Sequence, residues 1–374
     1  MVTHKQCGDR VLGVYDCRPI NAQKCSVWMR GVGDGYHRHD AQLTGEIPHM
    51  PQIQQGPNAV LEAGRRLRQG GLVVIPTETV YGLAGSTHNP DALVGIFALK
   101  GRPQDNPLIA HVDSIDSAKQ LTSRWPESAT ALTAALWPGP LTIVLPRSQD
   151  VPPIASAGLD TLAIRMPNHP VAQEILEAAG GPLSAPSANR SGRISPTTAS
   201  HVLDDYHDVD AASDLLIIDG GPCDQGIEST VIDLSGSSPR LLRPGTVARG
   251  AIEDLIGPLA IDPLPSSQDA SPGTTLRHYA PSKPVHICQQ SSILALLDEG
   301  GEAVVIGPGT IVVPQRYTHL QLPTDPVDAA RMLYALLREA DRPGTSHIIV
   351  VLPEGEQWEA VRDRLSRSAT RAVE

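Results

Sequence analysis

Residues 70–111 read GGLVVIPTETVYGLAGSTHNPDALVGIFALKGRPQDNPLIAH, and the other motifs of the chain are arranged around this segment. Its apolar run Leu72–Ile75 follows two glycines and is rich in β-branched residues, which is typical of a strand buried on both faces. A polar turn follows Pro76. A helix comes next, because Asn89 is a favourable N-cap residue and Pro90 suits the first helical position. The stretch therefore predicts a strand, a polar turn, a helix and a basic loop.

Polar side chains stand on both sides of this predicted helix. Thr77, Glu78 and Thr79 come directly after the strand, where α/β sheets bind their ligands. Lys100 and Arg102 follow the helix, and as an isolated pair they would only complement the negative end of the helix dipole. Because further hydroxyl-rich and cationic segments follow along the chain, we favour the interpretation that these groups converge on one anionic ligand.

Charge and composition restrict the possible functions. The chain has 374 residues and a net charge of −11, so stable electrostatic binding of nucleic acid is not expected. Any phosphate site must be a local group of cationic side chains. No apolar run is long enough to span a bilayer and the N-terminus lacks a secretory signal, so a cytoplasmic protein is expected. The five cysteines form no zinc or disulfide pattern, which predicts reduced thiols.

Composition divides the chain into four parts. Residues 1–50 show neither helical nor strand periodicity, which predicts either a disordered extension or a start site at Met50. Residues 57–247 alternate apolar strands with helices and carry the polar motifs. Residues 248–284 form a linker rich in Pro, Ser and Gly. Residues 285–374 again alternate strand and helix, as in a small parallel α/β domain, without a G-x-G-x-x-G or Walker motif.

Four cationic side chains are predicted to meet in one pocket of this acidic chain. Arg165 and Arg243 each stand before a proline at the end of a predicted strand, a position that suits a ligand site. For Arg165 alone, pairing with a structural carboxylate is an equally good explanation. The segment PLSAPSANRSGRISPT at 182–197 is either a surface loop or a phosphate-binding loop, and we favour the latter. The predicted group is Lys100, Arg165, Arg193 and Arg243.

Taken in order, the motifs resemble the threonylcarbamoyl-adenylate synthase family in its longer two-domain form. The resemblance covers residues 57–284 by motif, and the last ninety residues agree in position and class. Its segments are PTETVYGL at 76–83, KGRPQDNPL at 100–108, LWPGPLTIVL at 136–145, AIRMPNHP at 163–170, SAPSANRSG at 184–192, GIESTVIDL at 226–234, LLRPG at 241–245 and SPGTTLRHYAP at 271–281.

The resemblance implies a fold and an activity. The expected fold is α/β, with an N-terminal twisted mixed α/β domain that holds a concave basic site and a small C-terminal Rossmann-like parallel α/β domain. The expected nucleotidyltransferase reaction joins L-threonine, bicarbonate and ATP into L-threonylcarbamoyladenylate and releases pyrophosphate. The product supplies a tRNA-modifying complex that makes N6-threonylcarbamoyladenosine (t6A). Mg²⁺ is expected to arrive with ATP rather than at a protein metal site.

The same resemblance implies roles for individual residues. The expected catalytic signature, Lys-x-Arg and Ser-x-Asn, falls on Lys100, Arg102, Ser187 and Asn189. The expected L-threonine contacts are Thr79, His111, Arg165, Ala185 and Ser229, with Arg165 binding the carboxylate through both ends of its guanidinium fork. The expected ATP contacts are Arg102, Asn106, Thr161, Ser187, Ser195, Arg243 and Tyr279, with Tyr279 closing over the nucleotide from the linker.

Two alternatives remain open at this point. Carbamoyltransferases of the hydrogenase-maturation type contain a similar domain, but they add zinc-finger cysteine pairs and an acylphosphatase-like domain that this sequence lacks. A non-catalytic RNA-binding module is disfavoured by the acidic composition and by the single Phe in the chain.

Overall fold

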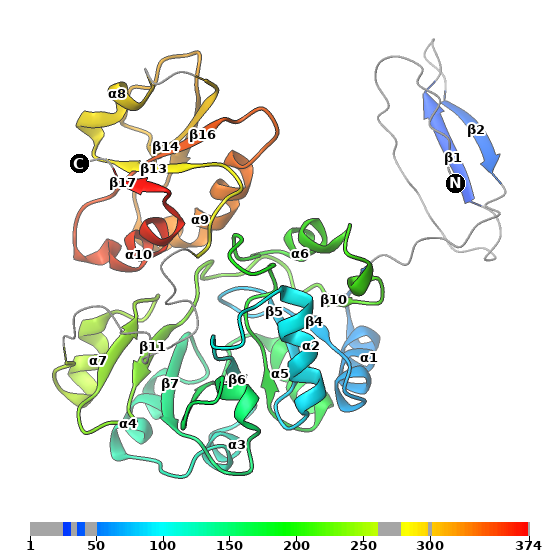
Figure 1. Ribbon diagram of the computed structural model, residues 1–374, viewed down its shortest axis with the longest axis vertical. Helices are drawn as coiled ribbons and strands as arrows, with labels where there is room; N and C mark the ends of the chain where they lie inside the picture. The colour runs from blue at the N-terminus through cyan, green and yellow to red at the C-terminus, as the bar shows by residue number, and fades with distance from the viewer. Residues whose placement is uncertain (1–24, 31–35, 42–50, 261–277, 298–300, 373–374) are drawn as a thin grey trace. The chain divides into compact units, whose positions relative to one another are not determined.

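The computed structural model describes residues 25–30, 36–41, 51–260, 278–297 and 301–372 (Figure 1). It divides into two compact units, Met1–His49 and Met50–Glu374. In the first unit β1 (Cys25–Arg30) and β2 (Tyr36–Ala41) pair as an antiparallel hairpin. The sequence predicted no strand here, because neither segment alternates apolar and polar residues, and backbone pairing does not require that alternation. The rest of the predicted extension lies outside the described residues.

The second unit begins with a large mixed sheet and its covering helices. The sheet contains ten strands in the order β12-β11-β7-β8-β6-β9-β5-β4-β10-β3, and both parallel and antiparallel neighbours occur, as expected for a mixed α/β domain. The strands are β3 (Gln52–Gln54), β4 (Val73–Ile75), β5 (Gly82–Ser86), β6 (Ile109–His111), β7 (Leu141–Pro146), β8 (Thr161–Arg165), β9 (Leu183–Ser184), β10 (Leu216–Ile218), β11 (Thr230–Asp233) and β12 (Arg240–Arg243).

Seven α-helices and two 3₁₀ turns accompany the strands of this part of the chain. α1 and α5 pack together, and Gly64 of α1 lies so close to α5 that a Cβ there would come 2.6 Å from the Cβ of Ala178. The elements are α1 (Pro57–Arg68), α2 (Pro90–Lys100), α3 (Ile115–Gln120), α4 (Glu127–Leu136), η1 (Pro153–Ser156), α5 (Pro170–Ala179), α6 (Ala199–Tyr206), η2 (Asp210–Ala212) and α7 (Arg249–Ile256).

Strand β4 is buried on both faces, as its apolar run predicted. Val73 and Ile75 belong to the core that α1 and α5 cover, whereas Val74 belongs to the core on the α2 side. The predicted helix start is also confirmed, because the Asn89 side chain accepts hydrogen bonds from the first N–H groups of α2 and Pro90 is its first residue. The fold therefore holds the turn after β4 rigidly between two cores.

Strand β5 is an element that the sequence interpretation missed. The predicted polar turn after β4 is followed at once by β5, whose sequence GLAGS contains no β-branched residue. Packing explains the strand, since a Cβ on Gly85 would lie 3.0 Å from Leu72 and 3.3 Å from Ala92. The two glycines lower the local strand propensity and also allow this close approach of β5 to its neighbours.

The chain ends in a five-stranded parallel sheet with the order β15-β14-β16-β13-β17. Leu333 of α9 and Leu365 of α10 pack with one face of this sheet, and Ile293 of α8 packs with the other. This layering confirms the predicted parallel α/β class of the C-terminal domain. Its elements are β13 (Val285–Cys288), η3 (Gln290–Ser292), α8 (Ile293–Leu297), β14 (Ala303–Pro308), β15 (Thr318–Leu322), α9 (Pro326–Ala340), β16 (His347–Val351), η4 (Glu356–Trp358), α10 (Glu359–Ser368) and β17 (Arg371–Ala372).

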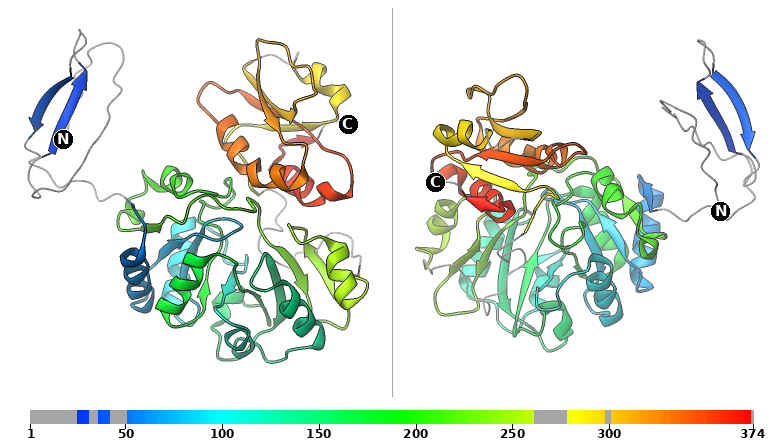
Figure 2. Two further views of the ribbon diagram at one scale, coloured as in Figure 1. Left: turned by 180° about the vertical axis from the view of Figure 1, so that it is seen from behind. Right: turned by 45° about the horizontal axis from the view of Figure 1, so that its top comes forward.

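Helices α9 and α10 connect the two sheets of the second unit. They lie on the side of the C-terminal sheet that faces the large sheet, as Figure 1 and Figure 2 both show. Arg338 of α9 pairs with Asp205 of α6 at 2.8 Å, and the backbone N–H of His278 donates to the carbonyl of Arg367. Within the described residues, none of the helices is both long and apolar enough to span a bilayer.

Candidate active site

The candidate site is a cavity at the ends of several strands of the large sheet. β4 leads into the turn that holds Thr79, β6 ends at His111 and β8 ends at Arg165. Ser229 enters β11 and Arg243 ends β12. All five side chains line the same cavity, although they lie far apart in the sequence. This is the sheet edge at which α/β proteins bind their ligands.

All the residues predicted to contact L-threonine line this cavity. Ala185 joins the four others from the loop after β9. The hydroxyl of Ser229 lies 2.7 Å from that of Thr142 and accepts a hydrogen bond from Arg243 at 3.2 Å. The structure therefore brings this predicted set together, and its assignment to threonine stays a prediction.

Arg165 is both a cavity residue and one half of a buried ion pair. Its Nη2 lies 2.6 Å from Oε2 of Glu78, its Nη1 donates to the hydroxyl of Thr79 at 2.8 Å, and its Nε donates to the carbonyl of Gly139. Burial raises the pKa of Glu78, but the charge of Arg165, the backbone hydrogen bond of Asn168 and the hydrogen bond of Arg165 together outweigh it, and the net pKa is lowered. The structure thus shows the predicted pairing of Arg165 with a carboxylate, and its role in ligand binding stays a prediction.

His111 supplies a neutral imidazole to the cavity. Burial, followed by the positive charge of Arg165, lowers its pKa to about 3. Its Nδ1 lies 3.1 Å from the carbonyl oxygen of Ile109. At neutral pH this side chain therefore takes part in hydrogen bonding without adding charge.

The residues predicted to contact ATP are only partly gathered at the cavity. Asn106 orients Arg102, because its Oδ1 accepts from Arg102 Nη2 at 2.5 Å. Ser195 donates its hydroxyl to Glu228 at 2.6 Å. Thr161 lies at the start of β8, four residues before Arg165, and does not line the cavity. The four that do line it are Arg102, Ser187, Arg243 and Tyr279.

Two residues of the predicted catalytic signature lie behind the cavity wall. The buried ammonium of Lys100 donates to the backbone carbonyls of Ser187 and Asn189. The Asn189 amide donates to the carbonyls of Arg190 and Arg193, at 2.8 Å each. Burial, followed by the charge of Arg102, lowers the pKa of Lys100 well below its usual value. In this conformation both side chains hold the loop that presents Ser187.

The prediction that Arg193 shares one pocket with the other cations is wrong. Arg193 is exposed and lines a separate cavity of about 490 Å³ together with Arg338. Arg165 and Arg243 line the candidate site, and Lys100 contacts the backbone of a lining residue, Ser187. Sequence spacing could not separate these cases, because Ser187 and Arg193 belong to the same polar loop and yet line different cavities.

Tyr279 and His278 fill much of the cavity. Both are buried and line it, and the free volume that remains is only about 40 Å³. Tyr279 has φ +59°, an uncommon backbone conformation for a residue with a side chain, and its buried hydroxyl has no hydrogen-bond partner among the described residues. Binding of a ligand as large as a nucleotide therefore requires these two residues to move.

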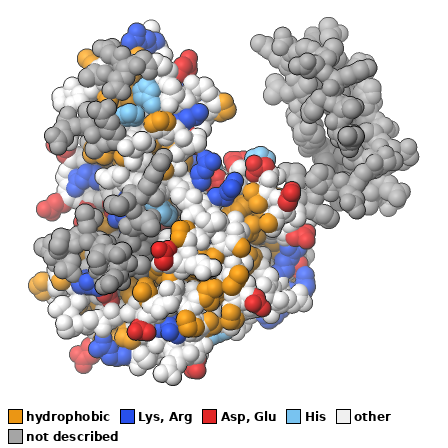
Figure 3. Space-filling model, viewed as in Figure 1, with side chains coloured by type: hydrophobic (Ala, Val, Ile, Leu, Met, Phe, Trp, Pro, Cys, Tyr) orange, Lys and Arg blue, Asp and Glu red, His pale blue; other side chains and the backbone are white. Residues whose placement is uncertain are grey.

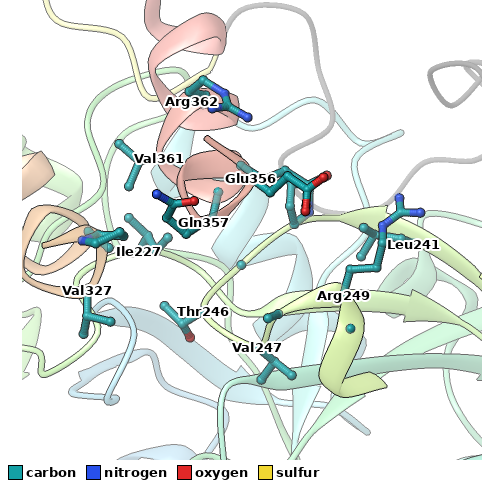
Figure 4. A pocket seen from close by; sticks show the side chains of 18 of the residues that line it. Ile227, Leu241, Thr246, Val247, Arg249, Val327, Glu356, Gln357, Val361 and Arg362 are labelled. Atoms are coloured by element: carbon teal, nitrogen blue, oxygen red, sulfur yellow. The ribbon is translucent and has the colours of Figure 1, made fainter. Parts of the chain in front are cut away.

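A second, larger cavity lies next to this site but contains none of the predicted site residues. Its volume is about 670 Å³, and Figure 4 shows that Thr246 and Val247 on one side face Gln357 and Val361 of the C-terminal domain on the other. Its lining mixes carboxylates, Arg249, Arg362 and apolar groups. Chemistry therefore points to the smaller cavity, where buried hydroxyl and cationic groups converge.

Comparisons with known proteins agree with this geometry. The "Telomere recombination" family model matches residues 65–245, and the model of the threonylcarbamoyl-AMP synthase C-terminal domain matches residues 247–370. The chain is 40% identical to the threonylcarbamoyl-AMP synthase of Pyrococcus abyssi over 321 residues, which cover 81% of this chain and 92% of the relative. This chain belongs to the threonylcarbamoyl-AMP synthase family.

Other members of the threonylcarbamoyl-AMP synthase family are also similar. The Schizosaccharomyces pombe enzyme is 32% identical over 356 residues, covering 80% of this chain and 85% of that one. The solved structure of P. abyssi Sua5 complexed with L-threonine matches with a TM-score of 0.79 at 38% identity, covering 87% of this chain and 99% of that chain. The match includes both α/β domains, which confirms the two-domain arrangement predicted for this family.

Sequence reasoning overlooked three residues that line or contact the candidate site. Glu228 lines the cavity, and its carboxylate accepts hydrogen bonds from Tyr334 and Arg364, both at 2.8 Å. Glu228 lies inside the quoted segment GIESTVIDL, so its position was visible although its role was not. Tyr334 and Arg364 lie on helices of the C-terminal domain, and nothing in the local pattern indicates that they reach the site.

Proposed function

We propose that this chain synthesises L-threonylcarbamoyladenylate from L-threonine, bicarbonate and ATP, with release of pyrophosphate, for t6A modification of tRNA. Family membership supports the reaction class. The observation on which the proposal depends is that neutral hydroxyl and imidazole groups and cationic guanidinium groups converge on one cavity. The residues concerned are Thr79, His111, Arg165 and Ser229 on the amino-acid side and Arg102, Ser187, Arg243 and Tyr279 on the nucleotide side.

The threonine half of the site is built around Arg165. Its two terminal nitrogens point to Thr79 and Glu78, so a carboxylate bound to the guanidinium would be held in a fixed orientation. The amine of threonine then attacks bicarbonate, a C–N bond forms, and water leaves to give a carbamate. Neutral His111 lies in this part of the cavity and can share a proton of the amine without repelling the cation of Arg165.

The nucleotide half of the site carries the charge needed for adenylate formation. A carbamate oxygen attacks the α-phosphorus of ATP, a P–O bond forms, and the bond to the β-phosphate breaks with its electron pair leaving on pyrophosphate. Arg102 and Arg243 are buried in the cavity wall, where a low dielectric strengthens their attraction for the developing phosphate charge. The substrate is itself the nucleophile, so positioning and charge are sufficient for catalysis.

Mg²⁺ enters this proposal as part of its nucleotide substrate. Among the described residues no group of three or more His, Cys, Asp and Glu side chains could hold a metal ion. Oxygen ligands from the triphosphate suit Mg²⁺, which usually keeps several of its waters. We place the reaction in the cytoplasm, in a catalytic domain of residues 57–247 that a linker of residues 248–284 joins to the C-terminal domain.

No observation favours the alternative of a non-catalytic RNA-binding module. On the part of the surface in Figure 3 that the described residues form, basic side chains stand in small groups among acidic ones. The cationic side chains of the site are buried instead. Binding of RNA through phosphate contacts would need many exposed Lys and Arg residues on one face.

The proposal is tested by measuring pyrophosphate release with one substrate omitted at a time. Release should require ATP, L-threonine and bicarbonate together, and mass spectrometry should detect threonylcarbamoyladenylate. The Arg165→Lys variant keeps a cation beside Glu78 but loses the guanidinium fork, so KM for threonine should rise about tenfold or more while KM for ATP changes little.

Arg240→Lys is the matched control for this substitution. Arg240 pairs with Asp233 at 2.7 Å in the β11–β12 hairpin and does not line the cavity, so its replacement should leave both KM values unchanged. Pyrophosphate release that is independent of threonine would refute the proposed reaction. An Arg165→Lys enzyme with an unchanged threonine KM would refute the role given to Arg165.

A further inference from the structure

A carboxylate of the candidate site is held by side chains from the C-terminal domain. Glu228 is buried and lines the cavity beside Ser229, Arg243 and Tyr279. Its Oε1 accepts a hydrogen bond from the hydroxyl of Ser195 at 2.6 Å. Its Oε2 accepts two more, each 2.8 Å long, from the α9 and α10 residues Tyr334 and Arg364. Among the described residues, the C-terminal domain therefore supplies two of the three side chains that donate to this carboxylate.

Arg364 joins three separate segments around the site. Its side chain is fully buried, and its Nη1 donates to the carbonyl of Pro244, directly after Arg243, at 3.0 Å. Its Nη2 donates to the backbone carbonyl of Glu228 at 3.3 Å. Its guanidinium carbon lies 5.4 Å from the ring centre of Tyr279, within the range of a cation–π interaction. One side chain of α10 thus fixes the entry to β11, the end of β12 and the linker.

Glu228 is ionised in this environment. Burial raises its pKa, but the charges of Arg364 and Arg243 and the hydrogen bonds of Ser195 and Arg364 together outweigh that effect, so the pKa is lowered to about 2. A buried anion next to a site for a triphosphate would repel that ligand unless a cation neutralised it. Arg364 is the cation in direct contact with this carboxylate, at 2.8 Å.

We propose that Arg364 and Tyr334 are positioning residues of the nucleotide site, which neutralise and orient Glu228 so that Arg243 can receive the triphosphate. This inference rests on the proposed function, because it assumes that ATP is the ligand of the cavity. It makes the C-terminal domain a part of the site. Tyr279 packs against the same group, with its ring centre 5.6 Å from that of Tyr334.

The test measures equilibrium binding of Mg²⁺-bound ATP by calorimetry, together with KM values from pyrophosphate release. Arg364→Met removes the 2.8 Å ion pair of Glu228 with the C-terminal domain, so ATP affinity should fall at least about tenfold while KM for threonine changes much less. The double variant Glu228→Gln/Arg364→Met also removes the charge of Glu228 and should recover most of the affinity. A purely architectural role for Arg364 would give no such recovery.

Arg338→Met is the matched control. Arg338 also joins the two domains, through Asp205 and the carbonyl of Ile194, but it does not line the candidate site. ATP affinity in this variant should stay close to that of the wild type. Equal losses in Arg338→Met and Arg364→Met would overturn the proposal, because domain docking alone would then explain both.

Two further variants keep the proposal testable if Arg364→Met fails to fold, as judged by circular dichroism. Tyr334→Phe removes only the hydroxyl that donates to Glu228 and should weaken ATP binding severalfold. Arg364→Lys keeps the charge but loses the guanidinium group that contacts Glu228, and it should also weaken ATP binding. Unchanged affinity in both would overturn the inference. The variants of Arg364 and Tyr334 could weaken ATP binding as expected while the wild type shows no threonine-dependent pyrophosphate release. That result would refute the proposed function and leave this inference standing.

Discussion

The contact between Gly226 and helix α9 offers a sharp test of how the domains are joined. Gly226 lies in the segment before β11 and has φ +74°, a left-handed conformation that favours glycine. A Cβ at this position would lie 2.4 Å from both the Cα and the carbonyl oxygen of Arg331, and 2.7 Å from the carbonyl oxygen of Ala330. These are backbone atoms of α9, so no side-chain rotation can relieve the overlap.

The cost of Gly226→Ala has two components. A residue with a Cβ in the left-handed region costs about 1–2 kcal/mol. Non-bonded carbon atoms are in contact at about 3.5–4.0 Å, so α9 would have to move by about 1 Å or more, and overpacking of this kind costs about 1–3 kcal/mol. Together the substitution should lower the free energy of unfolding by about 2–5 kcal/mol. It should also weaken ATP binding, because α9 carries Tyr334.

Gly221→Ala separates the two components. Gly221 has φ +86° but no atom within 4 Å of its would-be Cβ, so this control has the conformational cost without the overlap. Urea unfolding followed by circular dichroism should place the Gly226→Ala variant about 1–3 kcal/mol below the Gly221→Ala variant. If both variants unfold at the same urea concentration, α9 does not rest on Gly226 as described.

Two further predictions concern charges in the site. Arg165→Met leaves the buried carboxylate of Glu78 unpaired and should lower the free energy of unfolding in urea by about 3–5 kcal/mol. The double variant Glu78→Gln/Arg165→Met should recover most of this stability. Equal losses of stability in the single and the double variant would contradict the ion pair. His111 has a pKa of about 3, below its value of 6.5 in the unfolded chain, so the unfolded state binds more protons as the pH falls. The contribution of neutral His111 to the free energy of unfolding is therefore complete above pH 6.5 and is lost as the pH falls toward 3. His111→Asn should therefore flatten the fall in stability between about pH 7 and 5, by about 2 kcal/mol, and thermal melts parallel to those of the wild type would refute this assignment.

Much of the fold was predictable because local signals and burial agree. The strand signal before Pro76, the N-cap at Asn89 and the strand that ends in Arg165 all appear in the structure within about one residue of their predicted limits. β5 was not predictable, because GLAGS has weak strand propensity and becomes a strand only through contacts with Leu72 and Ala92. Local preference failed where tertiary packing outweighed it.

The site was predictable to the extent that its residues lie at strand ends and in polar motifs. Sequence pattern alone was enough to place Thr79, Arg165 and Ser229 in polar segments next to buried strands, because apolar runs and the polar residues that flank them are visible in the sequence. Only the tertiary structure decided that Arg193 turns away from the candidate site and that Arg364 reaches it. The physical reason is that a side chain's direction and its distant partners depend on how separate elements pack, which no local pattern records.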